Sequence, residues 1–218
     1  MIPEQASYTE TEERIFEAAL GVFSRKGKDG ARMQEIADEA GINKAMLHYY
    51  FRSKDRLYEA VFDYVFRRFM LALSDAIQEA ESFEAMLRRF IDSYISFHQE
   101  HPEVMRLWVH ENLAGAPVVR QKIQTYGREI ELAPPRVFVT RMQQAIDAGE
   151  IRAVDPFHTF VTLLGASMFF FLAFPTMSAL NPALAVDPEA VVEGRKQHLF
   201  DLLYHGLQPY PGKAGEQR

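Results

Sequence analysis

Apolar residues recur at helical spacing along nearly the whole chain, and no segment shows the strict alternation that marks a half-buried strand. The first apolar stripe runs through Ile15, Ala19 and Phe23, with polar residues between them. It predicts a helix over about residues 9–26, with Thr9 or Thr11 to cap it and Gly27 to end it. The pattern as a whole predicts an all-α protein.

Two short helices are expected next, at about residues 33–40 and 44–50, with Gly41 between them. Ser53 is then placed to cap a much longer helix that runs over about residues 54–81. Short helices therefore give way to long apolar ones at this point, which is where we expect the boundary between two domains.

Further helical stretches, bounded by glycine and proline, bring the total to about nine helices. They are expected at about residues 83–100, 103–113, 118–148 with a kink or break at its two prolines, 156–174 and 188–207. The predicted division of the chain is an N-terminal domain over 1–53, a second helical domain over 54–208 and a flexible tail over 209–218.

The stretch between Asp155 and Asp187 contains no acidic residue, lysine or arginine. Its uninterrupted apolar part is shorter than the ~20 residues that a bilayer-spanning helix needs. His158 and Thr162 interrupt it, and no cluster of basic residues flanks it. A helix buried against a partner is therefore the favoured interpretation, and a membrane-associated helical bundle is the alternative.

Charge and cysteine content narrow the class of protein. The formal net charge of −6 argues against a general nucleic-acid coat protein. Between Arg25 and Arg56, however, eight lysines and arginines stand against five acidic residues. The absence of cysteine excludes disulfides and thiolate metal sites and suits a reducing cytoplasm. The polar, acidic start does not resemble a secretory signal. We expect a cytoplasmic protein with a locally basic N-terminal region.

Residues 33–57 have the spacing of a helix-turn-helix. Ile36 and Ala37 fall on the inner face of the first short helix, Gly41 makes the turn, and Leu47 packs the second helix back. The outer side of the second helix carries small, polar, basic and aromatic residues that suit a major groove, namely Asn43, Lys44, Ala45, Met46, His48 and Tyr49. Two short helices around a glycine also occur in helical proteins that bind no DNA, so spacing alone leaves that alternative open.

The stretch GINKAMLHYYFRSKDRL, residues 41–57, resembles the recognition segment of the TetR (tetracycline-repressor) family of transcriptional regulators. The preceding IADEAG is similar to the family's IA-x-x-AG, and AALGVFSRKG is similar to its first helix. The resemblance is detailed over about residues 10–65; beyond them only the helix order and the DAGEIRAVDP link look familiar. It implies a three-helix DNA-binding domain followed by a helical domain for ligand binding and dimerisation.

The resemblance also implies roles for single residues. Lys44, Ala45 and His48 would approach base edges, whereas Tyr49 and Tyr50 would contact the phosphate backbone. A phosphate would also pair with the lysine that begins the long helix. The expected DNA-binding residues are Arg32, Asn43, Lys44, Ala45, Met46, His48, Tyr49, Tyr50 and Lys54.

One position departs from the family pattern. Arg32 stands where the family usually has a threonine or serine that caps the second helix and touches phosphate. Arginine can reach a phosphate but cannot cap a helix. Three other assignments have alternatives: Tyr50 packed under the first helix, His48 as a solvated surface group, and Lys54 simply exposed.

The last two expected helices carry more apolar surface than an outer helix of a monomer should show. The resemblance implies that they pair with their copies in a four-helix interface of a homodimer. A monomeric core is the alternative. The expected interface residues are Phe160, Leu164, Met168, Phe171, Val192, Leu199, Phe200 and Leu203.

The middle helices are rich in aromatic residues and methionine, which suits an apolar or aromatic effector, although an aromatic stripe at helical spacing is more often plain core. The candidate pocket residues are Phe66, Phe69, Met70, Tyr94, Phe97, Met105, Trp108 and Tyr126. An effector among them would tilt the long helix as a lever and lower the affinity for DNA.

Other chemistry finds little support. His98 and His101 lie three residues apart and His110 adjoins Glu111, but without cysteine or an HExxH motif we expect no metal. No GxSxG motif or glycine-rich phosphate loop indicates an enzyme, and no cofactor is expected. The sequence therefore predicts a ligand-responsive repressor that binds a palindromic double-stranded operator as a homodimer.

Overall fold

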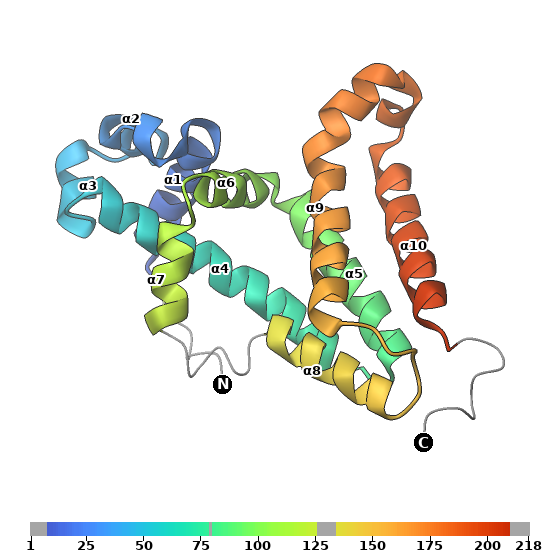
Figure 1. Ribbon diagram of the computed structural model, residues 1–218. Helices are drawn as coiled ribbons and strands as arrows, with labels where there is room; N and C mark the ends of the chain where they lie inside the picture. The colour runs from blue at the N-terminus through green and yellow to red at the C-terminus, as the bar shows by residue number, and fades with distance from the viewer. Residues whose placement is uncertain (1–7, 79, 126–133, 210–218) are drawn as a thin grey trace. The chain divides into compact units, whose positions relative to one another are not determined.

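The computed structural model describes residues 8–78, 80–125 and 134–209, and within them every regular element is a helix. Ten α-helices and one 3-10 helix follow one another along this described part of the chain (Figure 1). The prediction of an all-α fold is confirmed.

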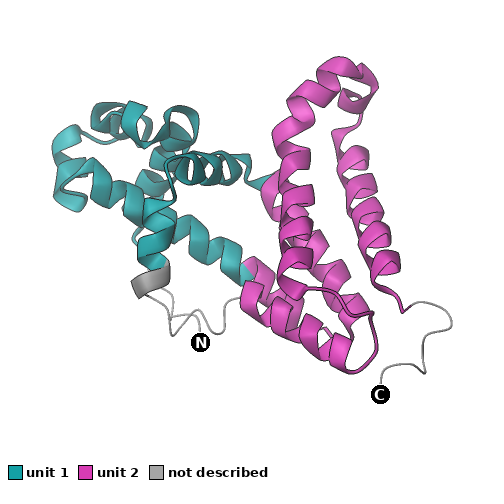
Figure 2. Ribbon diagram, viewed as in Figure 1, with its two compact units in different colours: residues 1–71, 100–132 teal, residues 72–99, 133–218 magenta. Residues whose placement is uncertain are grey.

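The helices form two compact units (Figure 2). The first unit comprises Met1–Leu71 and Glu100–Leu132, and the second comprises Ala72–Gln99 and Ala133–Arg218. Packing therefore groups two later helices with the N-terminal ones. The expected boundary after residue 53 separates DNA binding from ligand binding and dimerisation, whereas the two units are defined by packing. This boundary therefore stays a prediction.

Helix α1 (Glu10–Gly30) begins with a reciprocal cap. The Thr9 hydroxyl accepts a hydrogen bond from the backbone N of Glu12, and the Glu12 carboxylate accepts one from the backbone N of Thr9. Gly27, which was expected to end the helix, instead kinks it with a φ of 66°. The helix resumes after this kink because glycine adopts the left-handed conformation with little strain.

Helices α2 (Met33–Glu39) and α3 (Lys44–Tyr50) form the expected helix-turn-helix. Gly41 makes the turn between them with a φ of 65°. Ile36 and Ala37 of α2 and Leu47 of α3 are fully buried, which fixes the inner faces of both helices. The remaining faces of these short helices are consequently free to carry function.

Three more helices complete the first unit: the N-terminal part of α4 (Lys54–Gln78), α6 (Pro102–Leu113) and α7 (Pro117–Thr125). Rings from α1, α4 and α6 form its core. Phe23 packs edge-on against Tyr58, and Phe62 stacks against Trp108 with ring centroids 5.6 Å apart. The core therefore ties α6 to the two helices that frame the helix-turn-helix.

The second unit contains the rest of α4 with α5 (Phe83–Glu100), α8 (Pro134–Asp147), α9 (Pro156–Leu180), the 3-10 helix η2 (Pro182–Ala185) and α10 (Pro188–Leu207). Its core is aromatic: the ring of Phe138 lies 4.8 Å from that of Phe90 and 5.4 Å from that of Phe160. The helix expected over residues 118–148, with a kink or break at its two prolines, is described as α7 and α8, and α8 begins at Pro134.

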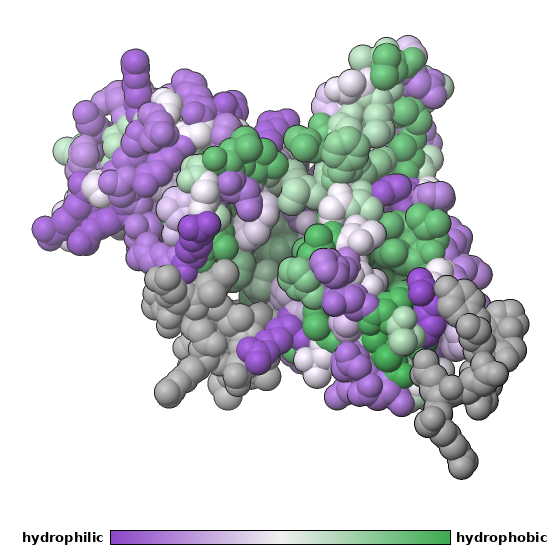
Figure 3. Space-filling model, in the orientation of Figure 1, coloured by the Kyte–Doolittle hydropathy of each residue, from purple (hydrophilic) through white to green (hydrophobic). Residues whose placement is uncertain are grey.

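Helix α9 extends beyond its predicted end at Phe174 and includes Pro175 within it. It is long and apolar enough to cross a membrane by length and composition, yet only 17% of its most apolar window is buried in the protein. Hydrophobic residues gather over the α9–α10 hairpin, whereas the surface over α1–α3 is mainly hydrophilic (Figure 3). A large apolar surface on α9 is therefore left uncovered by the residues that the structure describes.

Candidate nucleic-acid interface

The outer face of α3 presents the six residues that the sequence pattern placed there. All of them are exposed, and Tyr49 has 83% of its surface accessible. They are Asn43, Lys44, Ala45, Met46, His48 and Tyr49. Because Leu47 is buried beneath them, this face has the chemistry and the accessibility that contact with base edges requires.

Asn43 has a structural task in addition to its place on this face. Its side-chain Oδ1 accepts a hydrogen bond of 2.8 Å from the backbone N of Met46, so it caps the N-terminus of α3. The side-chain amide NH₂ group keeps its two donors for other partners. The sequence pattern predicted Asn43 only as a DNA contact, although asparagine directly before a helix is also a recognisable capping signal.

Tyr50 is half-buried at the end of α3. Its ring stacks on Phe51 at 6.4 Å, and Phe51 in turn lies 5.5 Å from Phe16 of α1. The Tyr50 ring thus lies on Phe51, the residue that packs against α1, and the alternative that Tyr50 itself packs under α1 stays a prediction. Contact of the Tyr50 hydroxyl with a phosphate stays a prediction.

Arg32 occupies the N-cap position of α2, is exposed, and makes no capping hydrogen bond through its side chain. The expectation that arginine fails to cap is confirmed. Its guanidinium is long enough to reach a phosphate beside α2, and this role stays a prediction.

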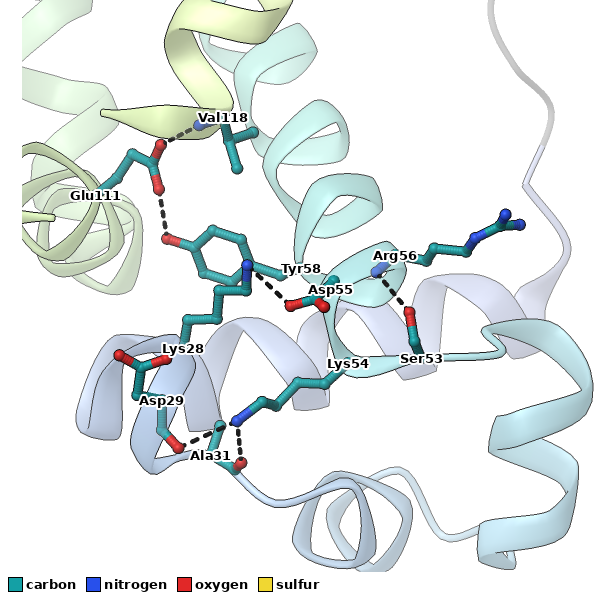
Figure 4. A network of polar contacts seen from close by, with 10 residues as sticks. All are labelled: Lys28, Asp29, Ala31, Ser53, Lys54, Asp55, Arg56, Tyr58, Glu111 and Val118. Atoms are coloured by element: carbon teal, nitrogen blue, oxygen red, sulfur yellow. Dashed lines mark hydrogen bonds and ion pairs between the residues drawn. The ribbon is translucent and has the colours of Figure 1, made fainter. Parts of the chain in front are cut away.

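Lys54 begins α4, and its ammonium already has partners within the protein. Its Nζ donates hydrogen bonds to the backbone carbonyls of Asp29, at 3.0 Å, and Ala31, at 3.1 Å (Figure 4). An ammonium has three donors, so one remains for a phosphate. The predicted phosphate contact stays untested, but Lys54 also joins the end of α1 to the start of α4.

Several basic residues counted earlier toward the local positive charge are ion-paired. The pairs are Arg25 with Glu39, Lys26 with Glu35 at 2.6 Å, and Lys28 with Asp55 at 2.9 Å. Bonding to Lys28 holds the pKa of the Asp55 carboxyl below its usual value. These pairs fasten α2 and α4 to α1. The ion pairs between described residues leave out Arg32, Lys44, Arg52 and Arg56, which are all exposed.

The effector candidates are divided between the two units. Phe66, Phe69, Met70, Met105 and Trp108 lie in the first unit, and Tyr94 and Phe97 in the second. Tyr126 falls outside the described residues. Those of the first unit include half-buried rings that continue the aromatic core of α4 and α6. Burial raises the pKa of the Tyr94 hydroxyl in the second unit. Their part in binding a ligand stays a prediction.

Half of the expected dimer residues are buried in the protein's own core, namely Phe160, Val192, Leu199 and Phe200. The other half, Leu164, Met168, Phe171 and Leu203, are partly exposed. A side chain already buried in its own chain has little surface to lose against a partner. The exposed apolar side chains of these helices stand at neighbouring positions instead: Phe157, Val161, Phe169, Leu172 and Leu202.

The histidines considered as metal ligands have other surroundings. Nδ1 of His98 lies 2.8 Å from the backbone carbonyl of Tyr94, in a buried position. The ring of His110 packs beside Gly27 of α1. Within the described residues, no group of three or more histidines and acidic residues is placed to hold a metal ion.

Comparison with known families covers most of the chain. Residues 15–61 match the family model described as bacterial regulatory proteins, tetR family. Residues 84–203, more than half of the chain, match the model of the tetracycline repressor-like C-terminal domain. The first match contains the whole helix-turn-helix together with most of α1.

Similar proteins have been characterised as regulators. The transcriptional regulator RutR of Escherichia coli K12 is 26% identical over 195 residues, which are 89% of this chain and 89% of RutR. The transcriptional repressor SCO4008 of Streptomyces coelicolor is 32% identical over 124 residues, 55% of this chain and 61% of that protein.

A solved structure shares the fold. The TetR-family regulator PfmR of Thermus thermophilus superposes with a TM-score of 0.71 at 21% identity, over 93% of this chain and 100% of PfmR. Both halves of the chain thus match models of one family. The chain belongs to the TetR family of bacterial transcriptional regulators.

Proposed function

We propose that this regulator is a repressor that binds a palindromic operator as a homodimer and releases it when a small, largely apolar molecule binds. The observation that carries the proposal is the outer face of α3. Lys44 and His48 lie one helical turn apart on it, as do Ala45 and Tyr49, and all four are exposed. Such a face offers donors to guanine or adenine edges and a small contact for a thymine methyl group.

The phosphate contacts surround this face. The Tyr49 hydroxyl, the Arg32 guanidinium and the remaining donor of Lys54 come from three different helices. Contacts of this kind set the register of a protein on the duplex but do not read its sequence. The proposal therefore divides the residues into base readers on α3 and phosphate binders around it.

Dimerisation is supported by one face of α9. Phe157, Val161, Gly165, Phe169 and Leu172 follow one another at intervals of three or four residues, and all are exposed. We call this set the α9 stripe. Apart from the neighbouring backbone of α9 itself, no atom of the described residues lies within 4 Å of the position that a Cβ at Gly165 would take, so a second helix can approach closely there. The occupant we propose is the α9 stripe of a second copy, since one helix-turn-helix reads too few base pairs for useful affinity.

The effector is proposed to act through α4. This helix carries Lys54 in its first turn and the half-buried rings of Phe66 and Phe69 further along. Trp108 of α6 stacks on Phe62 one turn before Phe66. An apolar ligand among these rings would move α4 against α6 and shift the recognition helices from the ~34–36 Å spacing that successive major grooves require. The ligand acts by binding the two forms with different affinity.

The test begins with selection of duplexes from a random pool by the wild-type protein, followed by titration at several salt concentrations. We expect two inverted half-sites about one helical turn apart, bound with strong salt dependence. Failure to enrich any sequence would sink the proposal. Light scattering without detergent tests what covers the α9 stripe. A dimer supports a second copy of the chain, whereas a protein that stays in solution only with detergent supports the membrane alternative.

The effector is sought with the same material. Apolar and aromatic compounds are screened for quenching of Trp108, which is the only tryptophan of the chain. Each hit is then titrated with and without the selected duplex. An inducer must bind more weakly in the presence of DNA, because coupling between two sites is reciprocal. Equal affinity in both titrations would remove the compound from consideration. The cytoplasm is the compartment in which we propose that this regulator acts.

A further inference from the structure

Glu111, in the last turn of α6, is the one acidic residue among the described residues whose side chain is fully buried. Its carboxylate meets two other helices (Figure 4). The hydroxyl of Tyr58 on α4 donates to Oε2 at 3.0 Å. The backbone N–H groups of Val118 and Val119, in the first turn of α7, donate to Oε1 at 2.6 and 3.3 Å. One side chain therefore joins α4, α6 and α7.

A buried carboxylate is unfavourable unless hydrogen bonds replace its water. Here the donors are one hydroxyl and two backbone amides, and the amides lie at a helix N-terminus that favours negative charge. Loss of the α7 amides would leave the charge with Tyr58 alone. The position of α7 and the position of Glu111 are thus energetically linked.

Tyr58 carries this link into the DNA-binding helices. Its ring packs edge-on against Phe23 of α1 at 4.9 Å, and Nζ of Lys28 lies 5.5 Å from its centroid. Lys28 also pairs with Asp55 in the first turn of α4. Displacement of the Tyr58 ring must therefore disturb the contact between α1 and α4 that supports the helix-turn-helix.

A second contact, made by the preceding residue, holds the same turn of α6 on α1. Gly27 is buried at the kink of α1, and a Cβ placed on it would lie 3.3 Å from Nδ1 of His110. The close approach of the two helices is possible because Gly27 has no side chain. Through His110 and Glu111, the end of α6 contacts α1 and α4 at once.

We infer that Glu111 is a positioning residue that couples the corner between α6 and α7 to the DNA-binding helices through the hydroxyl of Tyr58. The inference rests on the proposed function, because it concerns how DNA binding communicates with the rest of the first unit. Bound DNA restricts the motion of α1, α3 and the start of α4. The hydrogen bond from Tyr58 then restricts the motion of the Glu111 side chain, and the hydrogen bonds from Val118 and Val119 to Glu111 restrict the motion of the first turn of α7. A displacement of α7 acts in the opposite direction and loosens the DNA-binding helices.

The test measures hydrogen exchange of the backbone amides of Val118 and Val119, with and without a duplex selected from a random pool by the wild-type protein. In the wild type, DNA should slow both amides at least about fivefold, the lower end of usual allosteric coupling. In Tyr58→Phe, which keeps the packed ring and removes only the hydroxyl, DNA should leave these rates unchanged.

Tyr64→Phe is the matched control. Tyr64 lies on the same helix, and its hydroxyl donates to Glu17 of α1 at 2.9 Å rather than to α6. This variant should keep the wild-type response of Val118 and Val119 to DNA. If Tyr58→Phe does not unfold cooperatively, Glu111→Leu replaces it, with the same loss of response expected, because leucine can bond neither Tyr58 nor the α7 amides.

The outcomes separate the two proposals. A wild type that enriches no duplex contradicts the proposed function and the coupling together. A wild type that binds its selected duplex without slowing Val118 and Val119 overturns the coupling alone. So does a Tyr58→Phe protein whose amides respond to DNA as strongly as those of the wild type.

Discussion

Nζ of Lys54, the first residue of α4, donates a hydrogen bond of 3.1 Å to the backbone carbonyl of Ala31, just beyond the end of α1. The same ammonium bonds the carbonyl of Asp29. Carbonyls at the end of a helix lack partners within the helix, and a cation there also meets the negative end of the helix dipole. Lys54 therefore stabilises the joint between α1 and α4 even without DNA.

We expect Lys54→Ala to lower the free energy of unfolding by about 1 kcal/mol, because two carbonyls lose their donor. The measurement is urea denaturation. Arg56→Ala is the matched control: its side chain is exposed and only its backbone N bonds Ser53, so stability should stay within about 0.5 kcal/mol of the wild type.

If Lys54 also contacts a phosphate, Lys54→Ala lowers the salt slope of DNA binding by about 1. A lowered stability with an unchanged salt slope would assign Lys54 to the joint alone. Unchanged stability would show that the two hydrogen bonds to α1 contribute nothing.

Substitutions of Asn43 can distinguish its role as the cap of α3 from its predicted contact with DNA. Asn43→Asp retains an oxygen that can accept from the backbone N of Met46, so the thermal midpoint should be close to that of the wild type. Its added negative charge should weaken DNA binding by repelling phosphate. Asn43→Ala should instead lose about 1 kcal/mol of stability with the cap. An Asn43→Asp protein with undiminished DNA affinity would place this residue away from the phosphates.

The exposed residues of α3 can be replaced without harm to the core. Lys44→Ala and His48→Ala should each relax the preference at particular base pairs by ~1–3 kcal/mol, which is the discrimination of one good base contact. Tyr49→Phe should weaken binding to all sequences alike, since it removes a phosphate donor. Competition assays with single-base variants of the selected duplex distinguish the two patterns. A uniform loss in Lys44→Ala would reassign it to the phosphate backbone.

Substitutions in the α9 stripe should break the dimer without unfolding the protein. Gly165→Glu has free space within its own chain, and Leu172→Glu replaces an exposed residue. Light scattering at micromolar concentration should report monomers, and DNA affinity should fall because one half-site is lost. Leu113→Glu, at a still more exposed leucine of the first unit, is the control and should remain dimeric. Dimers in both α9 variants would move the interface elsewhere.

Alkaline pH tests the environment of Tyr58. Burial, then the charge of Glu111, raise the pKa of its hydroxyl above the usual value near 10. The pKa of this hydroxyl is higher in the folded protein than in the unfolded chain. The protonated Tyr58 hydroxyl therefore contributes fully to the free energy of unfolding below about pH 10, and this contribution falls as the pH rises further. The difference in unfolding free energy between the wild type and Tyr58→Phe should therefore shrink above about pH 10, by at most ~1.4 kcal/mol per pH unit. A constant difference up to about pH 11 would contradict the assigned environment.

The local signals of the sequence predicted the helices well where their ends depend on neighbouring residues. The bounds of α3, α5 and α10 agree with the expectation, and each of these helices begins directly after a capping residue, namely Asn43, Ser82 and Asp187. Helix α9 was predicted too short because Pro175 was taken as a stop, whereas this proline is accommodated within the helix.

The recognition face of α3 could also be identified from sequence. A single buried residue, Leu47, defines the inner side of a short helix, so the exposed set follows from helical geometry alone. The inner face of α9 could not be found in the same way. Apolar residues surround that helix on all sides, and only packing against Phe90 and Phe138 shows that Phe160 points inward while Phe157 and Val161 point outward.

The sequence by itself determined the helices, the turn at Gly41 and the outer face of α3, because these depend on residues within one or two helical turns. Only the tertiary structure decided that Lys28 pairs with Asp55, that Lys54 bonds the end of α1, and that Glu111 meets Tyr58. These partners lie far apart along the chain. A charged side chain has the same local pattern whether its partner is water, a phosphate or another helix, and packing alone selects among them.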